Sequence, residues 1–192
     1  MRSLPVFLSA AALFTIWPAA ATASSADNSS RGRELRVVSH VDLSRYLGKW
    51  YEIARYPNRF ERDCASDVTA SYAAQSDGRI EVVNVCSRND GKQKTARGKA
   101  KIVDPATNAK LKVTFFWPFY GDYWIIALGP EYNYAVIGEP GRKYLWILSR
   151  TPGLDGALYA SIQRQISAAG YDPAKLVMTP QKDVAIARKA ER

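Results

Sequence analysis

Hydrophobic and polar residues alternate in short segments from about position 49 onward, a pattern typical of antiparallel strands with one dry and one wet face. Between positions 110 and 115, for example, Leu111, Val113 and Phe115 alternate with polar residues. Turn-forming pairs such as Asp77-Gly78, and prolines such as Pro118, separate the segments. The pattern predicts eight strands, over residues 49–56, 67–75, 79–87, 95–103, 110–117, 123–128, 134–138 and 144–150.

The hydrophobic period changes after position 150, where apolar residues recur at helical spacing: Leu158, Ile162, Ile166 and Ala169. Asp155 stands where an N-cap is needed, and Gly170 stands where the helix should end. We therefore predict one amphipathic helix whose apolar stripe packs on the outside of the sheet, followed by a short edge strand at residues 176–179.

Eight antiparallel strands can close into a barrel that holds one small ligand, or stack as a two-layer sandwich filled by side chains. The chain has five Trp and eleven Tyr, and most of the Trp fall on faces predicted to be dry: Trp50, Trp117, Trp124 and Trp146. Aromatic side chains that line a cavity suit an amphiphilic ligand, but they also fill solid cores. The pattern by itself leaves both architectures open.

The N-terminal residues predict export. An apolar run from Leu4 to Trp17 is followed by Ala21-Thr22-Ala23, which fits a secretory signal cleaved after residue 23, although a retained anchor helix is the alternative. Residues 24–41 are then expected to form a flexible lead and residues 181–192 a disordered charged tail. The chain has 27 Lys and Arg against 18 Asp and Glu, so its net charge of +9 favours anionic partners.

Export also bears on the two cysteines, because paired thiols in an oxidising compartment usually form a disulfide. Cys64 and Cys86 flank a hairpin signal at residues 76–78. Symmetric folding about that turn places Cys86 opposite Val68, so we expect Cys64 to curl back over the strand end to reach its partner. With one His and two Cys, the chain lacks the ligands of a usual zinc site, and we predict no metal and no cofactor.

Three motifs resemble those of lipocalins in the right order. Gly48-Lys49-Trp50 resembles the Gly-x-Trp motif that opens the first barrel strand, and residues 132–135 and 146–150 resemble the second and third motifs. Residues 59–62 and 116–121 are similar to the branch that contains bacterial outer-membrane lipocalins and apolipoprotein D. The resemblance covers residues 42–180, and it implies an all-β, eight-stranded antiparallel up-and-down barrel with one C-terminal helix on the outside.

The resemblance also assigns residues to a site. Trp50 would close the base of the barrel, with Arg150 across its indole and Gly48 in the same structural motif. If Arg150 faces inward, the two-residue period also turns Leu148, Trp146 and Tyr144 inward, and the phase of Trp50 does the same for Glu52 and Ala54. The expected cavity-lining residues are Trp146, Trp124, Tyr120, Phe115, Tyr72 and Tyr144.

The function implied by the resemblance is noncatalytic binding, storage or transport of fatty acids or lysophospholipids for the cell envelope, with no catalytic residue. A lipid-modifying enzyme on the same barrel is the alternative, as is a haem or bilin carrier using His40. The expected partners are a small amphiphilic lipid and, transiently, an anionic membrane surface, but not nucleic acid. Monomer and homodimer both stay open. Many bacterial relatives carry a lipidated Cys, whereas the first Cys here is Cys64, so we expect a periplasmic or secreted protein whose association with the outer membrane is open.

Overall fold

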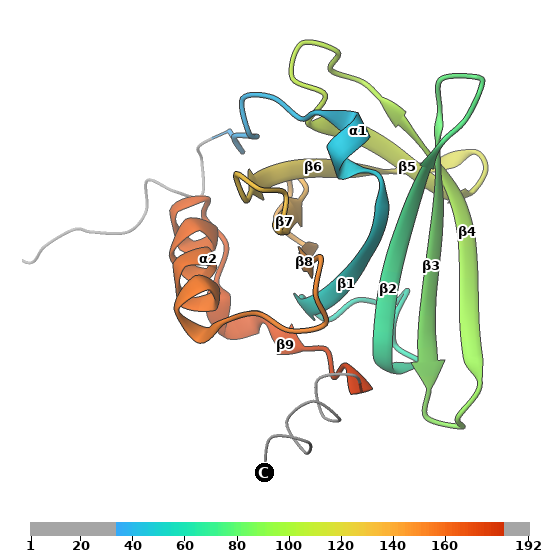
Figure 1. The fold of residues 1–192 in the computed structure, drawn as a ribbon, viewed down its shortest axis with the longest axis vertical. Coiled ribbons are helices and arrows are strands. Elements are labelled where there is room, and N and C mark those ends of the chain that lie inside the picture. The colour runs from blue at the N-terminus through green and yellow to red at the C-terminus, as the bar shows by residue number, and fades with distance from the viewer. Residues whose placement is uncertain (1–33, 183–192) are drawn as a thin grey trace, which may run out of the picture.

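The strands close into a barrel. The computed structural model describes residues 34–182, and the predicted signal segment, most of the flexible lead and nearly all of the charged tail lie outside the described residues. Each strand pairs antiparallel with the next, and β1 pairs with both β2 and β8 (Figure 1). This confirms the eight-stranded barrel and excludes the sandwich. The strands are β1 Gly48–Arg55, β2 Cys64–Ala74, β3 Ile80–Arg88, β4 Gln93–Ile102, β5 Lys110–Phe116, β6 Phe119–Leu128, β7 Tyr134–Gly138 and β8 Leu145–Ser149.

The two ends of the barrel differ. A short helix, α1 (Leu43–Tyr46), precedes β1 and packs at one end, where the backbone of Val41 also bonds to Thr107 and Asn108. Since neighbouring strands run antiparallel, the loops at residues 56–63, 89–92, 117–118 and 139–144 gather at the opposite end. We call the first end the closed end and the second the mouth.

The predicted helix forms as expected and covers the outside of the barrel. Helix α2 spans Gly156–Ala168, and the Asp155 side chain accepts hydrogen bonds from the first backbone N–H groups. Ile162 and Ile166 are fully buried in a cluster with Val136 and Ile147, which face outward from β7 and β8. Beyond the short 3-10 helix η1 (Pro173–Lys175), β9 (Val177–Met178) adds the predicted edge strand to β1.

A β-bulge in β1 changes which side chains face the lumen. The pairing of β1 with β8 shifts between Glu52 and Ala54, so that two successive residues oppose one. Trp50 and Glu52 face inward, whereas Ile53 and Ala54 belong to the cluster under α2. The prediction that Ala54 faces inward was therefore wrong. After the bulge Arg55 faces inward beside Trp146, its pairing partner.

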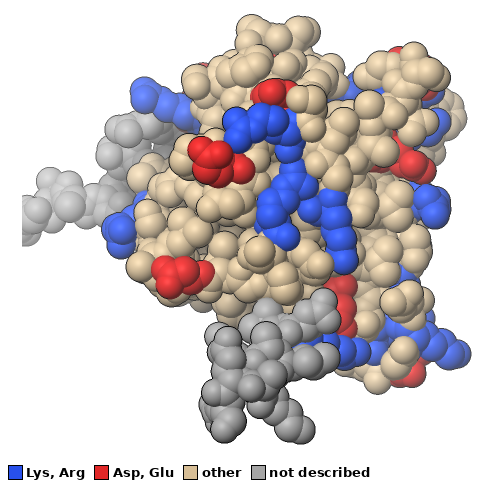
Figure 2. Space-filling view, in the orientation of Figure 1, with Lys and Arg blue, Asp and Glu red and all other residues tan. Residues whose placement is uncertain are grey.

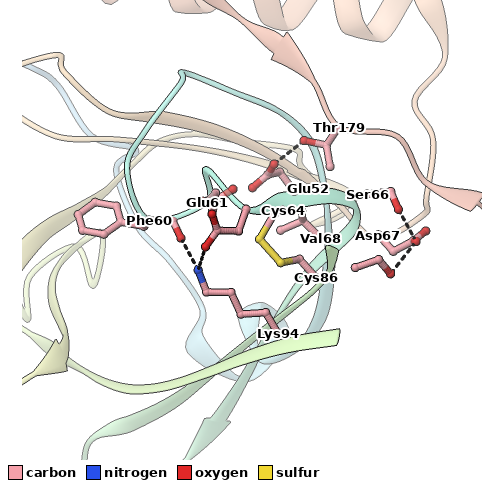
Figure 3. The surroundings of a disulfide bond; sticks show 12 residues. Glu52, Phe60, Glu61, Cys64, Ser66, Asp67, Val68, Cys86, Lys94 and Thr179 are labelled. Carbon is pink, nitrogen blue, oxygen red and sulfur yellow. Dashed lines mark hydrogen bonds and ion pairs between the residues drawn. A yellow bond between two sulfur atoms is a disulfide. The ribbon is translucent and has the colours of Figure 1, made fainter. Parts of the chain in front are cut away.

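The disulfide forms between Cys64 and Cys86 as predicted, with 5.6 Å between the Cα atoms (Figure 3). The expected route was wrong, because Cys64 stays within β2 and does not curl over the strand end. The pairing of β2 with β3 shifts twice between Cys64 and Thr69, which places Cys64 opposite Arg88. Cys86 is two residues from Arg88 along β3, close enough for the bridge to form.

Asp67 stabilises this irregular stretch of β2. Its φ is 55°, a left-handed conformation that Asp tolerates better than most residues. Its carboxylate accepts hydrogen bonds from the side chains of Ser66 and Ser87 and from the backbone N–H of Lys182. Burial raises its pKa, but these donors more than offset burial and hold the pKa at about 2. Asp67 therefore ties the C-terminal segment to the disulfide end of the barrel.

Candidate ligand site in the barrel

Trp50 lies at the closed end and is fully buried. Its indole N–H donates to the carbonyl of Tyr46 at 2.8 Å, and the Arg150 guanidinium lies over the ring, 3.8 Å from the centroid to Cζ. Arg150 also donates to the carbonyl oxygens of Lys49 and Tyr46, at 2.9 and 3.1 Å. Gly48 lies against the Arg150 guanidinium and has a φ of 92°, a left-handed backbone conformation that favours glycine. The structure thus brings together the three residues expected to close the barrel.

Three tyrosines stand above this base. The hydroxyl of Tyr123 lies 2.6 Å from that of Tyr46 and 2.8 Å from that of Tyr72. Burial raises the pKa of all three phenols, that of Tyr72 to about 12, so these hydrogen bonds join neutral phenols at pH 7. A cavity of about 10 Å³ beside them has room for about one water molecule. Tyr72 therefore lines the lumen, at its closed end.

Strand β8 and Tyr144, which directly precedes it, supply an inward stripe. Leu148 lies in the barrel core, Trp146 packs against that core, and Tyr144 stacks on Trp146 with 5.9 Å between ring centroids and 14° between planes. On the other side of the lumen β4 presents small inward residues, and the ring of Phe115 lies over Gly98, where a Cβ would be 2.8 Å from it. Trp146, Tyr144 and Phe115 therefore all contribute to the inner surface.

Two expected cavity residues lie outside the lumen. Trp124 follows the inward Tyr123, so the pleat turns it outward, where it packs beside the cluster under α2 with the Lys110 ammonium 4.4 Å from its ring. Gly121 pairs with the inward Val113, so the preceding Tyr120 faces outward. The Tyr120 ring is exposed beneath the Lys101 ammonium. The same alternation that places Tyr123 inside therefore corrects both assignments.

Trp117, expected on a dry face, is 82% exposed at the turn between β5 and β6. The exposed rings of Phe116 and Phe119 flank it, so this hairpin projects a group of aromatic side chains from the mouth. A hollow of about 490 Å³ opens beside it, lined by Phe116 and by residues 59, 60, 62 and 63 of the β1–β2 loop.

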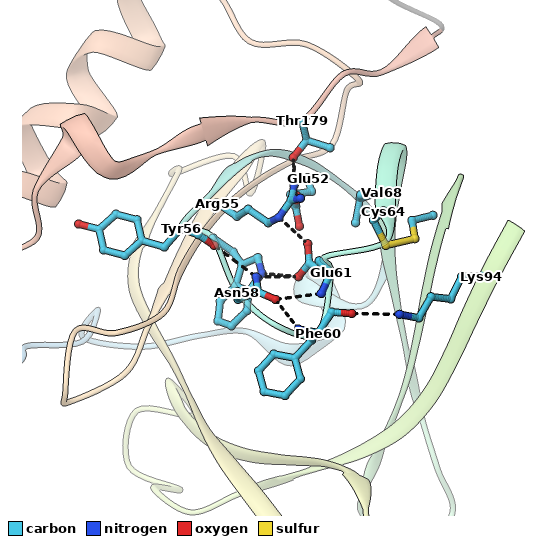
Figure 4. A network of polar contacts seen from close by, with 12 residues as sticks. Glu52, Arg55, Tyr56, Asn58, Phe60, Glu61, Cys64, Val68, Lys94 and Thr179 are labelled. Atoms are coloured by element: carbon cyan, nitrogen blue, oxygen red, sulfur yellow. Dashed lines mark hydrogen bonds and ion pairs between the residues drawn. A yellow bond between two sulfur atoms is a disulfide. The ribbon is translucent and has the colours of Figure 1, made fainter. Parts of the chain in front are cut away.

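A polar cluster that the sequence did not reveal lies in the mouth half of the barrel, beside β1 and the β1–β2 loop (Figure 4). Arg55 donates at 2.8 Å to Glu52 and at 2.9 Å to the hydroxyl of Thr179, and its Nε lies 3.1 Å from the carboxylate of Glu61. Thr179 in turn donates to Glu52. The indole N–H of Trp146 donates to Glu61 at 2.8 Å. Glu61 belongs to the β1–β2 loop, so this loop reaches into the barrel.

Burial dominates the electrostatics of the cluster. It raises the pKa of Glu52 to about 8, and the charge of Glu61 acts in the same direction, while Thr179 and Arg55 partly oppose both. Glu52 is therefore mostly neutral at pH 7. The sequence analysis turned Glu52 inward, but only the bulge brings Arg55 to it, and nothing in the residue pattern marks that bulge.

Residues 41–181 match a family model described as a lipocalin-like domain. The chain belongs to the lipocalin family. It is 41% identical to the outer membrane lipoprotein Blc of Escherichia coli K12 over 94% of this chain and 98% of that protein. This lipocalin is also 41% identical to temperature-induced lipocalin-1 of Arabidopsis thaliana, over 79% and 85% of the two chains. Bovine apolipoprotein D is 31% identical over 76% and 79%, which confirms the resemblance to that branch.

Solved structures confirm the fold. Insecticyanin from the tobacco hornworm Manduca sexta superposes with a TM-score of 0.62 at 23% identity, covering 77% of this lipocalin and 84% of that chain. Apocrustacyanin C2 gives a TM-score of 0.60 at 19% identity, over 73% and 79%. At these identities the likeness extends to the architecture alone.

Proposed function

We propose that this lipocalin binds and carries a single-chain amphiphilic lipid, a fatty acid or a lysophospholipid, with the acyl chain in the barrel. The observation that carries the proposal is the inward stripe from Leu148 through Trp146 to Tyr144, which joins the plugged base to the mouth. Burial contributes about 0.8 kcal/mol for each methylene, so a long chain supplies most of the affinity. Two changes must accompany binding: the β1–β2 loop shifts, because Glu61 and its partners occupy the upper lumen, and the inner side chains move apart, because the cavity at the closed end has room for only about one water molecule.

The two rival functions find less support in the molecule. Both cysteines of the chain are joined in the disulfide, so neither offers a thiolate nucleophile to a lipid-modifying enzyme. His40 is exposed in the segment before α1, away from the mouth, which does not favour it as a haem ligand inside the barrel. We therefore propose carriage without catalysis.

Replacing Trp146 with alanine is expected to weaken the binding of oleate and of an oleoyl lysophospholipid about tenfold. The loss of ~60 Å² of apolar contact at about 25 cal/mol/Å² corresponds to this change. Isothermal titration calorimetry of the two ligands measures it without relying on tryptophan fluorescence. Trp124→Ala is the matched control, since it removes the same side chain from the outer face. Equal weakening in both variants would show that the effect does not arise in the lumen.

We also propose that the protein is exported and meets its ligand at an anionic membrane surface, through its mouth. Phe60, Phe116, Trp117 and Phe119 are large exposed aromatic residues near the mouth, and Arg59 and Arg62 stand among them. Aromatic rings favour the lipid interface and cations favour anionic headgroups. Figure 2 shows Lys and Arg side chains grouped across the centre of one face, in keeping with the positive net charge. None of the helices within residues 34–182 is both long and apolar enough to span a bilayer.

The variant Trp117→Ala with Phe119→Ala is expected to bind vesicles of phosphatidylglycerol and phosphatidylcholine at least tenfold more weakly than the native protein. The two side chains offer ~100 Å² of apolar area to the membrane interface, which is sufficient for this effect. Cosedimentation with vesicles measures binding. Val103→Ser is the control, because it removes an exposed apolar side chain near the closed end. Undiminished sedimentation of the double variant would refute docking through the mouth.

A further inference from the structure

The β1–β2 loop places an acidic side chain inside the barrel. Glu61 comes from this loop, yet its side chain is only 16% exposed, because the carboxylate points into the mouth half of the lumen. Phe60, which is 52% exposed at the mouth, contacts Tyr144 with 5.6 Å between the ring centroids. The Lys94 ammonium holds the loop from β4, donating to the carbonyl of Phe60 at 3.2 Å.

The groups that receive Glu61 form an anion site. Arg55 on β1 and Trp146 on β8 are paired directly across the two strands, so the guanidinium and the indole N–H stand side by side. One carboxylate oxygen accepts from Trp146 at 2.8 Å, and the other lies 3.1 Å from Arg55 Nε. A guanidinium next to a second N–H donor suits a carboxylate or a phosphate.

Glu61 fits this site imperfectly. Its second oxygen, Oε2, is buried and close to Arg55 but lies outside hydrogen-bonding geometry. The Nη1 of Arg55 is committed to Glu52 and Thr179. The neutral carboxyl group of Glu52 is the remaining donor close to Glu61, so the site holds Glu61 with the help of a proton on its neighbour, whereas an anion that aligns with Arg55 does not need that proton.

The charges in the cluster also favour an anion. Glu52 is mostly neutral at pH 7, since its pKa is about 8, so Glu61 alone balances the positive charge of Arg55. If Glu61 leaves and a neutral group takes its place, the buried guanidinium loses its counter-charge. An anionic headgroup restores it.

We propose that Arg55 and Trp146 bind the anionic headgroup of the lipid, and that Glu61 occupies this site as an internal substitute until the ligand displaces it. The inference rests on the proposed function and specifies the headgroup class, a carboxylate or a phosphate. Departure of Glu61 also frees Phe60 from Tyr144, so the loop and the ligand compete for one space.

Glu61→Gln tests the proposal against two probes with the same chain, oleate and oleyl alcohol. We expect the variant to bind oleate about tenfold more tightly than the native protein and oleyl alcohol within twofold of it. The reason is that glutamine keeps the shape of the loop but no longer supplies the competing charge. Glu131→Gln, which removes a charge from the exposed loop at the closed end, should change neither affinity.

Because of Glu52, the Glu61→Gln comparison must also be made in a variant that lacks the Glu52 carboxyl group. Loss of the Glu61 charge lowers the pKa of Glu52, which could then ionise and balance Arg55 itself. The comparison is therefore repeated between Glu52→Gln and the double variant Glu52→Gln with Glu61→Gln, where the gain for oleate should be at least as large. Arg55→Gln should have the opposite effect: it should weaken the binding of oleate but not that of oleyl alcohol.

The possible outcomes separate the two proposals. If the native protein binds neither probe, the proposed function fails. If the native protein binds both probes and Glu61→Gln tightens the binding of both equally, then Glu61 only holds the loop in place. In that case the proposal of a headgroup site is refuted. No change for either probe in both backgrounds also refutes the site. Glu61→Gln is expected to increase affinity, and a misfolded protein would not show an increase. The test therefore still holds if Arg55→Gln folds poorly.

Discussion

Trp50→Ala is expected to lower the free energy of unfolding by about 4 kcal/mol, the middle of the range for truncating a buried aromatic residue. Trp50 is fully buried, and alanine would leave a cavity where the barrel base is now filled. The loss also removes the surface on which Arg150 lies, 3.8 Å from the ring centroid. The guanidinium then keeps its carbonyl partners but loses its aromatic contact.

Urea denaturation followed by circular dichroism measures this effect, and two variants provide controls. Trp117→Ala makes the same chemical change at an exposed turn and should shift the free energy of unfolding by no more than about 0.5 kcal/mol. Trp50→Phe keeps an apolar ring but loses the hydrogen bond to Tyr46, so it should fall between the native protein and Trp50→Ala. A native-like Trp50→Ala would show that the base of the barrel does not depend on the indole.

The sequence predicted the barrel well because its signals are local and repeated. Alternation and turn residues located all eight strands, and the Gly-x-Trp motif identified the strand that begins at the closed end. The phase of β8 followed from one residue, since an inward Arg150 turns Leu148 and Trp146 inward as well. Helix α2 was equally easy to predict from the sequence, because Asp155 and Gly170 mark its two ends.

The candidate site was predicted less completely, for a physical reason. Side-chain direction in a strand depends on counting residues in twos, so one extra residue reverses everything after it. The bulge at Ile53 and Ala54 therefore concealed Arg55, and no residue type there signals it. Trp124 shows the complementary error, because its large apolar ring fits the cavity chemically while the pleat turns it toward α2. Glu61 could not be placed at all, since a loop side chain has no period to follow.

Loss of the disulfide is the second large effect that we expect, at about 3 kcal/mol of unfolding free energy for the 22-residue separation between Cys64 and Cys86. The bridge restricts the unfolded chain, and in the folded state it fastens the start of β2 beside β3, where the pairing is irregular. Asp67 holds the same stretch from the other side through Ser66 and Ser87, so the barrel should still fold without the bridge.

The measurement compares urea denaturation of the native protein with and without dithiothreitol, together with the double variant Cys64→Ala and Cys86→Ala. The reduced native protein and the double variant should both unfold at lower urea concentration than the oxidised protein. The double variant should not respond to the reductant, which controls for effects of dithiothreitol elsewhere. Coincident transitions for oxidised and reduced native protein would mean that β2 and β3 are held by their hydrogen bonds and by Asp67 alone. In that case the cysteines would contribute little to the stability of the end of the barrel that carries Glu61.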